Sequence, residues 1–388
     1  MSSGSKRLLF LLLVCLLWGG GALWWLKRES APSERGAVVL NPSDLLSDQA
    51  HGFARATEVR EFRFPQDHAN HPDYRHEWWY FTGNLSTPAG RAFGYQFTLF
   101  RFALLPGEPE RTSAWAPRSV YMGHLAVSDV EGKRFLTRQK LGRAAVGLAG
   151  ASPEPLRVWL ENWRLEGDPE NGEPSRLSAA GDGVGIELRL APEKPVVLQG
   201  DRGLSQKGAE PGNASYYYSI PRLVTEGELV LGEEKFQVAG RSWMDHEWGS
   251  SALGSDVVGW DWFALQLRDG RDLMFYHLRG KSGASDSRSA GTVVNLDGSV
   301  LPLAATDVQL STRTRWKSPR TGIVYPIAWR LRIPSLDLTL EVEPRFAEQE
   351  WVEPVRYWEG AVTVTGDVAG EGYVELTGYD QQSTETDD

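Results

Sequence analysis

The sequence contains very little cysteine: Cys15 is the single cysteine among 388 residues. One thiol excludes an internal disulfide framework and a zinc site built from thiolates. Excess positive charge is also missing, because the formal net charge is −10 and the sequence pI is about 5.4. A chain of this charge lacks the basic surface that binds nucleic acid phosphates without regard to sequence. We therefore predict no nucleic acid partner.

Aromatic residues, in contrast, are plentiful. The chain has 16 Trp, 14 Phe and 12 Tyr, and its hydrophobic content is 41%. These residues are sufficient for well-packed cores, and the length favours two domains rather than one. The sequence therefore predicts a folded protein with two cores.

The first 28 residues contain an uncharged run, residues 8–26, with a Lys-Arg pair on each side. Its length matches that of a helix that crosses a bilayer. Small residues at 20–22 are compatible with cleavage as a signal peptide, whereas Trp24 and Trp25 suit an interfacial anchor. Both alternatives stay open. Either one predicts membrane contact through this segment and an extracytoplasmic location, periplasmic or secreted, for the rest of the chain.

After a linker at residues 29–58, the dominant pattern is short alternating or β-branched and aromatic runs, broken by Gly, Pro, Asn or Asp. Examples are residues 79–85, 94–100, 186–190 and 336–342. Strands of this kind with frequent turn signals are typical of antiparallel sandwiches and barrels. We therefore predict an all-β fold.

Two aromatic hairpins resemble each other at a separation of about 180 residues. The first starts at Trp79-Tyr80 and the second at Trp262-Phe263, and each has a Gly-Arg turn. A duplicated unit explains this similarity, although aromatic hairpins also resemble one another by chance.

Pro221 ends an aromatic run and suggests a boundary between the two units. The predicted domains are residues 59–222 and 223–382, followed by an acidic tail at 383–388.

The tripeptide His-Glu-Trp occurs twice, as His76-Glu77-Trp78 and as His246-Glu247-Trp248. A zinc protease helix needs a second histidine, but Tyr80 and Ser250 occupy the corresponding positions. A looser metal cluster from the histidines near residue 71 has no spacing that fixes its geometry. The Gly-x-Ser-x-Gly turn of serine hydrolases is also absent. We therefore predict neither a metal nor an organic cofactor.

The second tripeptide has more acidic and aromatic neighbours than the first, since Trp260-Asp261-Trp262 and Tyr276 follow it closely. A carboxyl group held against indole rings has a raised pKa and can donate a proton near neutral pH. Indole faces also stabilise a cation. The alternative is that the carboxylates cap turns and the aromatic residues fill the core. For His124, a buried core position is the better interpretation.

Several separated motifs occur in the order found in one known superfamily. They are residues 77–80, 94–98, 123–124, 203–208, 217–219, 243–249 and 260–262. Together they closely resemble the carotenoid 1,2-hydratase-like superfamily and its secreted, AttH-like branch, over about residues 60 to 380.

This resemblance implies two lipocalin-like β-barrels packed together and a large apolar ligand handled without a cofactor. In the hydratases, a His-x-Trp pair acts with a Tyr-x-Asp element. His246 and Trp248 match the pair, but the second element reads Tyr276-His277-Leu278 and has no aspartate. Asp245, Glu247 or Asp261 could replace the missing acid, or hydratase activity is absent.

We predict that the protein binds a hydrophobic lipid-like or polyene-like molecule and hydrates or isomerises it by acid catalysis. The alternative is a carrier without catalytic activity, or an accessory protein of an export-type membrane transporter. The predicted catalytic residues are Asp245, His246 and Glu247, with Asp245 or Glu247 as proton donor and His246 orienting the acid or a water molecule. The predicted ligand-binding residues are Trp248, Trp260, Asp261, Trp262, Tyr276, Glu77, Trp78, Trp79 and Tyr95. Function is expected at the second tripeptide, and architecture at the first.

Overall fold

The computed structural model describes residues 51–107, 113, 115–251, 253–254, 256–281, 285–352 and 355–380. The predicted membrane-directed segment and the acidic tail lie outside these residues. Of the predicted linker, residues 51–58 are described and form turns and coil. Among the described residues, no helix is both long and apolar enough to cross a bilayer.

Two antiparallel sheets make up nearly all of the described chain, so the all-β prediction is confirmed. Within the described residues, the first sheet has 13 strands. They are β1 (His76–Ser86), β2 (Ala92–Ala103), β3 (Ser119–Asp129), β4 (Arg134–Arg143), β5 (Ala149–Pro153), β6 (Leu156–Leu160), β7 (Trp163–Gly167), β8 (Pro174–Gly181), β9 (Val184–Pro192), β10 (Val197–Leu198), β11 (Leu204–Gln206), β12 (Ala214–Leu231) and β13 (Glu234–Ser251).

The second sheet has ten strands within the same described ranges. They are β14 (Val257–Leu267), β15 (Asp272–Gly280), β16 (Ala290–Val294), β17 (Val300–Ala304), β18 (Gln309–Lys317), β19 (Val324–Ile333), β20 (Leu338–Pro344), β21 (Glu350–Trp351), β22 (Tyr357–Gly366) and β23 (Gly370–Thr377). Short 3₁₀ turns occur at η1 (Gln66–His68), η2 (Ala305–Asp307) and η3 (Pro334–Leu336).

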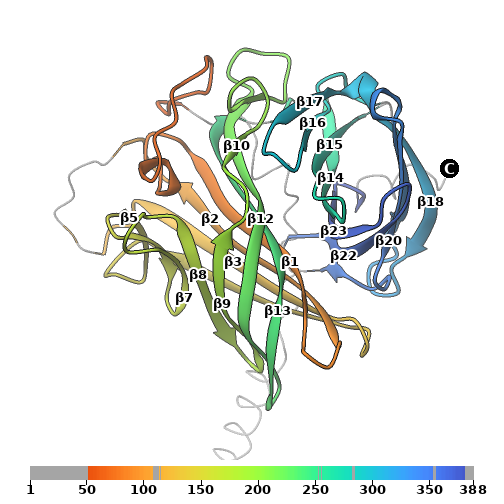
Figure 1. Ribbon diagram of the computed structural model, residues 1–388. Helices are drawn as coiled ribbons and strands as arrows, with labels where there is room; N and C mark the ends of the chain where they lie inside the picture. The colour runs from red at the N-terminus through yellow and green to blue at the C-terminus, as the bar shows by residue number, and fades with distance from the viewer. Residues whose placement is uncertain are drawn as a thin grey trace, which may run out of the picture. The chain divides into compact units, whose positions relative to one another are not determined.

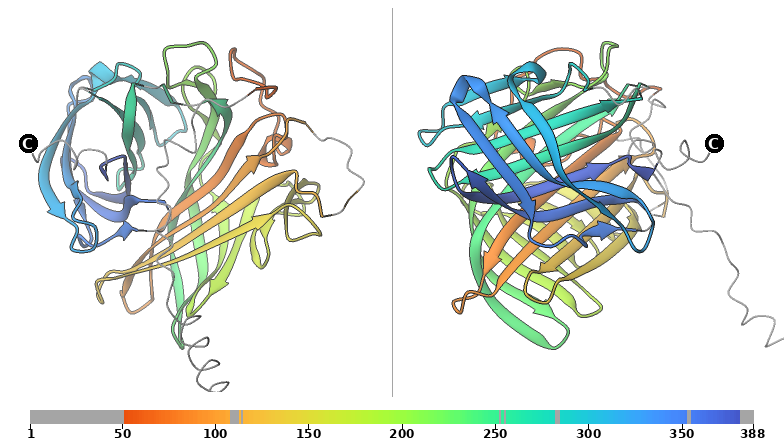
Figure 2. Two further views of the ribbon diagram at one scale, coloured as in Figure 1. Left: turned by 180° about the vertical axis from the view of Figure 1, so that it is seen from behind. Right: turned by 90° about the vertical axis from the view of Figure 1, so that its right-hand side faces the viewer.

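Each sheet is curled around its own apolar core, as Figures 1 and 2 show. The first sheet runs in the order β4-β3-β2-β1-β13-β12-β9-β8-β7-β6-β5, and the second in the order β17-β16-β15-β14-β23-β22-β20-β19-β18. Nearly all neighbours in this order are also neighbours in the sequence. This meander is the connectivity of up-and-down barrels.

The predicted domain boundary at residues 222/223 does not separate the two sheets, because it falls inside β12. The chain passes from the first sheet to the second between Ser251 and Val257. Pro221 marks a break in the β12–β13 register between Ile220 and Leu223, not a domain end. Proline has no N–H to donate to a neighbouring strand, and a bulge accommodates it within a long strand.

Both predicted hairpins exist, as β1–β2 and β14–β15. Their suggested alignment of Trp79 with Trp262 is wrong, however. Trp79 lies in the core of the first sheet, whereas Trp262 lies in the layer between the sheets. Side chains alternate between the two faces of a strand, so a shift of one residue exchanges the faces.

The two sheets pack face to face through a layer of aromatic and polar side chains. Asp272 of the second sheet is fully buried there and forms ion pairs with Arg222 (2.6 Å) and Lys194 (2.7 Å). Gly94 marks a close approach, because a Cβ at this position would lie 2.7 Å from the Cβ of Ala361. These contacts fix how the facing surfaces meet.

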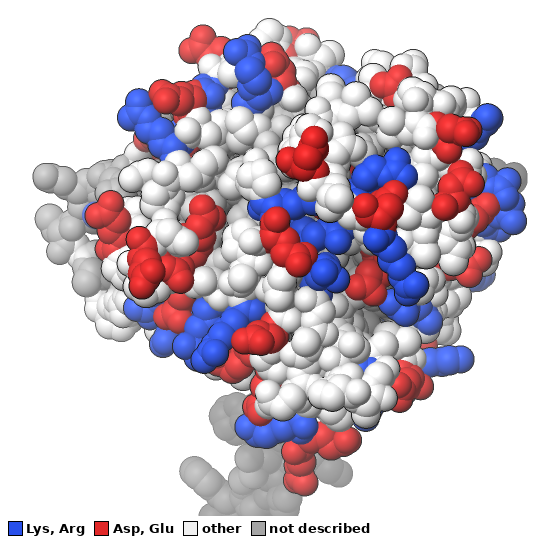
Figure 3. Space-filling view, viewed as in Figure 1, with Lys and Arg blue, Asp and Glu red and all other residues white. Residues whose placement is uncertain are grey.

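Charged side chains of both signs are interspersed over the face that Figure 3 shows, with wide uncharged areas between them. On this face, therefore, no continuous field of one sign is available to attract a polyelectrolyte.

Candidate functional site

The two His-Glu-Trp tripeptides lie opposite each other on paired antiparallel strands. In the register of β1 with β13, Glu77 is opposite Trp248, Trp78 is opposite Glu247, and Trp79 is opposite His246. Directly opposite residues in such a pair point to the same side of the sheet. The repeated motif is therefore one structural feature made from two strands.

Strand alternation divides this feature between two faces. Glu77, Trp79, His246 and Trp248 point into the curled first sheet, where both tryptophans belong to its core. Trp78 and Glu247, with Asp245 beside Glu247 on its strand, point toward the second sheet and line a pocket there. The predicted pairing of His246 with Asp245 or Glu247 is wrong, because adjacent residues of a strand face opposite sides.

On the inner face, Glu77 is the centre of a buried polar cluster. Its carboxylate accepts hydrogen bonds from Arg101 Nε (2.9 Å) and pairs with His71 Nδ1 (2.7 Å) and His246 Nε2 (3.0 Å). Burial alone would raise the pKa of Glu77, but the charges of Arg101 and His71 and these hydrogen bonds hold it well below its usual range. Glu77 is thus a buried carboxylate balanced by Arg101.

The cluster continues through Tyr218, whose hydroxyl lies 3.0 Å from His246 Nδ1 and 2.6 Å from His68 Nδ1. Burial lowers the pKa of His246 to about 4, so its ring is neutral at pH 7. The ligand atoms of His71, Glu77 and His246 lie within 4.8 Å of one another, a spacing compatible with a metal ion. The guanidinium of Arg101 already supplies the positive charge at Glu77, so the donor set fits a hydrogen-bonded network better than a metal centre.

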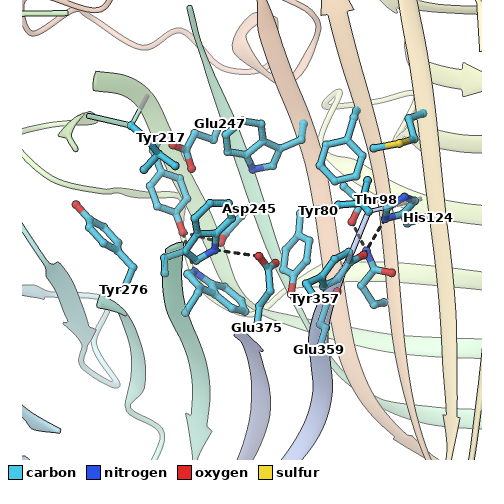
Figure 4. Close-up of a pocket in the computed structure, with 18 of the residues that line it drawn as sticks. Tyr80, Thr98, His124, Tyr217, Asp245, Glu247, Tyr276, Tyr357, Glu359 and Glu375 are labelled. Carbon is cyan, nitrogen blue, oxygen red and sulfur yellow. Dashed lines mark hydrogen bonds between the residues drawn. The ribbon is translucent and has the colours of Figure 1, made fainter. Parts of the chain in front are cut away.

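The pocket lies between the two sheets and has a volume of about 140 Å³. Its walls are mainly aromatic, and Figure 4 shows labelled side chains reaching it from both sheets. The aromatic and apolar lining residues are Trp78, Tyr80, Phe100, Phe102, Met122, Tyr217, Leu253, Trp260, Trp262, Tyr276, Leu278, Val355 and Tyr357. The polar ones are Gln96, Thr98, His124, Lys207, Asp245, Glu247, Glu359 and Glu375.

Asp245 is buried in the pocket wall beneath three hydrogen-bond donors. Tyr217 Oη donates to Oδ2 (2.6 Å), while Ser219 Oγ (2.5 Å) and Trp243 Nε1 (2.7 Å) donate to Oδ1. Burial raises the pKa of Asp245 to about 7, although these hydrogen bonds oppose the rise. Because both oxygens are already engaged, Asp245 fixes the orientation of Tyr217.

Glu359 and Glu375 bring two further carboxyl groups from the second sheet. Tyr80 Oη donates to Glu359 Oε1 (2.5 Å), and Trp260 Nε1 donates to Glu375 Oε1 (2.9 Å). Burial raises the pKa of Glu375 to about 7, and burial with the nearby charge of Glu375 raises the pKa of Glu359 well above its usual value. No donor among the described residues reaches Glu359 Oε2. Glu359 therefore keeps its proton to a higher pH than an ordinary glutamic acid, and it has one unengaged oxygen.

Glu247, in contrast, is paired. Its Oε1 accepts hydrogen bonds from Lys207 Nζ and from Ser215 Oγ (2.5 Å). Lys207 follows β11 and also lies over the rings of Tyr217 and Tyr276, at 5.2 and 5.5 Å from their centroids. The ion pair keeps Glu247 engaged, so it is a poorer proton donor than Glu359.

His124 is fully buried, as the sequence interpretation expects, and it also lines the pocket. Its Nδ1 lies 2.8 Å from Tyr357 Oη, across the junction between the sheets. Burial lowers the pKa of His124 to about 3, so the imidazole is neutral at pH 7. It offers a neutral hydrogen-bonding group at the end of the pocket opposite Tyr276, as Figure 4 shows.

Indole rings of the pocket wall are held in fixed orientations. Trp262 Nε1 donates to Tyr217 Oη (3.3 Å), and its ring packs edge-on against Tyr80, with centroids 5.2 Å apart. Trp260 is held through Glu375. Fixed aromatic faces next to neutral acids can stabilise a positive charge that forms beside them.

The structure thus separates the predicted site residues into two groups. The pocket contains Asp245, Glu247, Trp78, Trp260, Trp262 and Tyr276. Residues outside its lining are Glu77, Trp79, Tyr95, His246, Trp248 and Asp261. Tyr95 packs in the core of the first sheet, and Asp261 points into the second sheet, away from its neighbours Trp260 and Trp262.

Sequence reasoning missed Glu359 and Glu375. Glu359 is the one charged residue within residues 357–364, and Glu375 stands among aromatic and aliphatic residues at 372–376, although Glu371 lies on the same strand. That isolation was the available signal, because a charged residue in an otherwise apolar strand needs a partner or a role.

Comparison with known proteins gives the family. The AttH-like family model matches residues 55–379, nearly all of the described chain. This chain belongs to the AttH-like family. A solved structure from Nitrosomonas europaea, provisionally assigned as AttH, is 33% identical, has a TM-score of 0.76, and covers 84% of this chain and 99% of that one. The resemblance to the carotenoid 1,2-hydratase-like superfamily and the lipocalin-like fold are thereby confirmed.

Two proteins similar to this AttH-like protein are named after an enzymatic activity. The dehydratase asqC of Emericella nidulans is 24% identical over 229 residues, which span 53% of this chain. The match covers 62% of that protein, less than two-thirds of its length. The structure of kievitone hydratase from Nectria haematococca is 17% identical with a TM-score of 0.63, and covers 84% of this chain and 95% of that one. At this identity the likeness shows the fold.

If Glu77 has a structural role in this AttH-like protein, Glu77→Gln will leave the Arg101 guanidinium buried without its carboxylate. Breaking a buried ion pair costs about 3–5 kcal/mol. We expect a decrease of this size in the free energy of unfolding, measured by urea denaturation. The matched control is Glu187→Gln, whose partner Arg176 is 57% exposed, and which should cost less than about 1 kcal/mol. Equal stability of the two variants would refute the structural role.

Proposed function

We propose that this protein adds water to, or removes it from, a hydrophobic substrate by acid catalysis in the pocket between its sheets. The observation that supports this proposal is a fully buried carboxyl group, Glu359, which lies among fixed aromatic faces and whose pKa is raised well above its usual value by burial and by the charge of Glu375. A neutral acid can protonate a double bond or a hydroxyl group, and the aromatic walls favour the resulting cation.

In the hydration direction, the Glu359 carboxyl transfers its proton to one alkene carbon, and the other carbon becomes cationic. A water molecule forms the new C–O bond, and the proton it releases passes to Glu375. Because the charge of Glu375 raises the pKa of Glu359, proton return between the two groups restores the starting state. Dehydration follows the same steps in reverse: protonated Glu375 gives its proton to the hydroxyl, which leaves as water, and the ionised Glu359 removes the proton from the neighbouring carbon.

The remaining pocket residues position the reacting groups. Asp245 accepts a hydrogen bond from Tyr217, and Tyr217 accepts one from Trp262. One wall of the pocket therefore depends on a chain of hydrogen bonds. The volume of about 140 Å³ is close to that of a cavity that accepts a single benzene ring. We therefore propose that the pocket takes one ring-sized or isoprenoid-sized end of the substrate.

The names of two relatives agree with this proposal, because one is a dehydratase and the other a hydratase. The extracytoplasmic location, the lipid-like ligand and the alternative role beside an export-type transporter stay predictions from the sequence. A carrier would use the same aromatic pocket without needing Glu359 to be protonated. The protonation state of Glu359 therefore distinguishes the enzyme from the carrier.

The direct test of the reaction is Glu359→Gln, which keeps the shape of the side chain but removes the transferable proton. An acyclic isoprenoid with a terminal double bond is incubated with the protein in H₂¹⁸O, and label in the alcohol product is measured by mass spectrometry. General acid catalysis contributes roughly 10²–10⁴-fold, so labelling should slow by that factor while substrate binding persists.

Glu371→Gln is the matched control, since Glu371 lies on the same strand as Glu375 but outside the pocket, paired with Arg345. The Glu371→Gln variant should incorporate ¹⁸O into the alcohol product at the wild-type rate. Labelling by Glu359→Gln at the rate of this control would rule out Glu359 as the acid. Substrate that binds to wild type but never acquires label would favour the carrier.

The pH dependence of the reaction follows from the two glutamates. The base Glu375 has a raised pKa of about 7 and accepts a proton only when ionised, so the rate should rise as pH increases through about 7. It should fall again at higher pH, where Glu359 loses its proton. In kcat/KM profiles, Glu375→Gln should lose the rising limb and Asp245→Asn should keep it. A rising limb that survives in Glu375→Gln would contradict the assigned base.

A further inference from the structure

A second cavity of about 430 Å³ lies on the other face of β14 and β15, inside the curl of the second sheet. Its lining residues come from β14 and β15 on one side and from β18 and β19 on the other. These strands stand at different parts of the sheet order, so the curl of the sheet brings them together. The cavity is separate from the pocket between the sheets, because Asp261 faces it while Trp260 and Trp262 face the pocket.

Arg279 is the central charged group of this cavity. It is 6% exposed, and its guanidinium lies 3.7 Å from the ring centroid of Tyr379. Nε lies 3.3 Å from Asp261 Oδ1, and Nη2 donates to the carbonyl of Thr377. Among the described residues, no acceptor reaches Nη1. Stacking uses the face of a guanidinium and leaves its in-plane N–H groups available.

Asp261 is engaged with other partners and does not reach Nη1. Tyr379 Oη donates to Oδ1 (2.7 Å), and His277 Nδ1 lies 3.0 Å from Oδ2. The arrangement fixes the guanidinium and leaves one charged donor unused. A buried donor without an acceptor is costly, so a site of this kind is completed by a ligand.

A second unused donor lines the same cavity. Trp329 is 5% exposed, and its Nε1 has no acceptor among the described residues. Arginine and indole N–H groups can only donate, so a ligand that satisfies both must be an acceptor. Arg315 adds a further positive charge to the lining, in which Asp261 is the carboxylate. The surplus of positive charge favours an anion.

The wall also has apolar side chains, namely Phe275, Val308, Leu310 and Pro326, beside the polar Ser285 and Thr312. The volume is within the range of small-molecule sites. From the paired free donors and these apolar side chains, we infer that the second sheet encloses a binding site for a small carboxylate with an apolar tail, such as a medium-chain fatty acid. This site does not depend on the proposed reaction in the pocket between the sheets.

The test follows the indole N–H signal of Trp329 in ¹⁵N-labelled full-length protein, identified by its loss in Trp329→Phe. Octanoate should shift this signal in a saturable way, whereas octan-1-ol and inorganic phosphate should not. Arg279→Lys removes the planar donor fork and should weaken octanoate binding roughly tenfold. Leu310→Phe fills the cavity without changing any charge and should abolish the shift.

Met122→Phe is the matched control, because it fills the pocket between the sheets instead. It should leave octanoate binding unchanged. The inference is overturned if octanoate does not move the Trp329 signal or if octan-1-ol binds equally well. It is also overturned if binding responds to Met122→Phe but not to Leu310→Phe, because the fatty acid would then occupy the other pocket.

Discussion

The antiparallel pairing of β1 with β13 is the constraint on which the rest of the structure depends. It places two tripeptides, distant in sequence, opposite each other, and the two-residue period of a strand then sorts their side chains. Glu77 and His246 become part of a hydrogen-bonded interior in which Arg101 balances the charge of Glu77. Trp78 and Glu247 become part of a pocket that only the second sheet can close. One register therefore determines both the stability of the first sheet and the composition of the site.

Burial between two sheets gives this site its chemistry. Carboxyl groups from both sheets meet in an aromatic layer, where loss of water raises the pKa values of Asp245 and Glu375 to about 7. A single sheet with a solvated face could not produce this effect, because water would stabilise the ionised forms. The packing of two sheets thus supplies what neither sheet has alone: a water-poor compartment that raises the pKa of Glu359 well above its usual value.

The all-β class and the paired hairpins could be predicted from the sequence, because alternation and aromatic content are local signals. Half of the residues predicted for the site lie in the pocket. The side of the sheet to which each side chain points could not be predicted. Asp245 and His246 are neighbours in sequence, and only the assignment of their segment to a strand shows that they point apart. Pro221 indicated a break, but the length of β12 on both sides was not visible locally. Glu359 and Glu375 gain their role from a sheet packing that no short segment encodes.

The central claim is that the pocket holds a neutral glutamic acid at physiological pH. Infrared difference spectroscopy in D₂O measures this directly, because a protonated carboxyl has a C=O stretch that a carboxylate lacks. The account predicts a protonated-carboxyl band at pH 7 in the wild-type protein that loses intensity in Glu359→Gln, down to the part contributed by Asp245 and Glu375, and keeps its full intensity in Glu371→Gln. A wild-type spectrum without this band, or a band unchanged in Glu359→Gln, would contradict it.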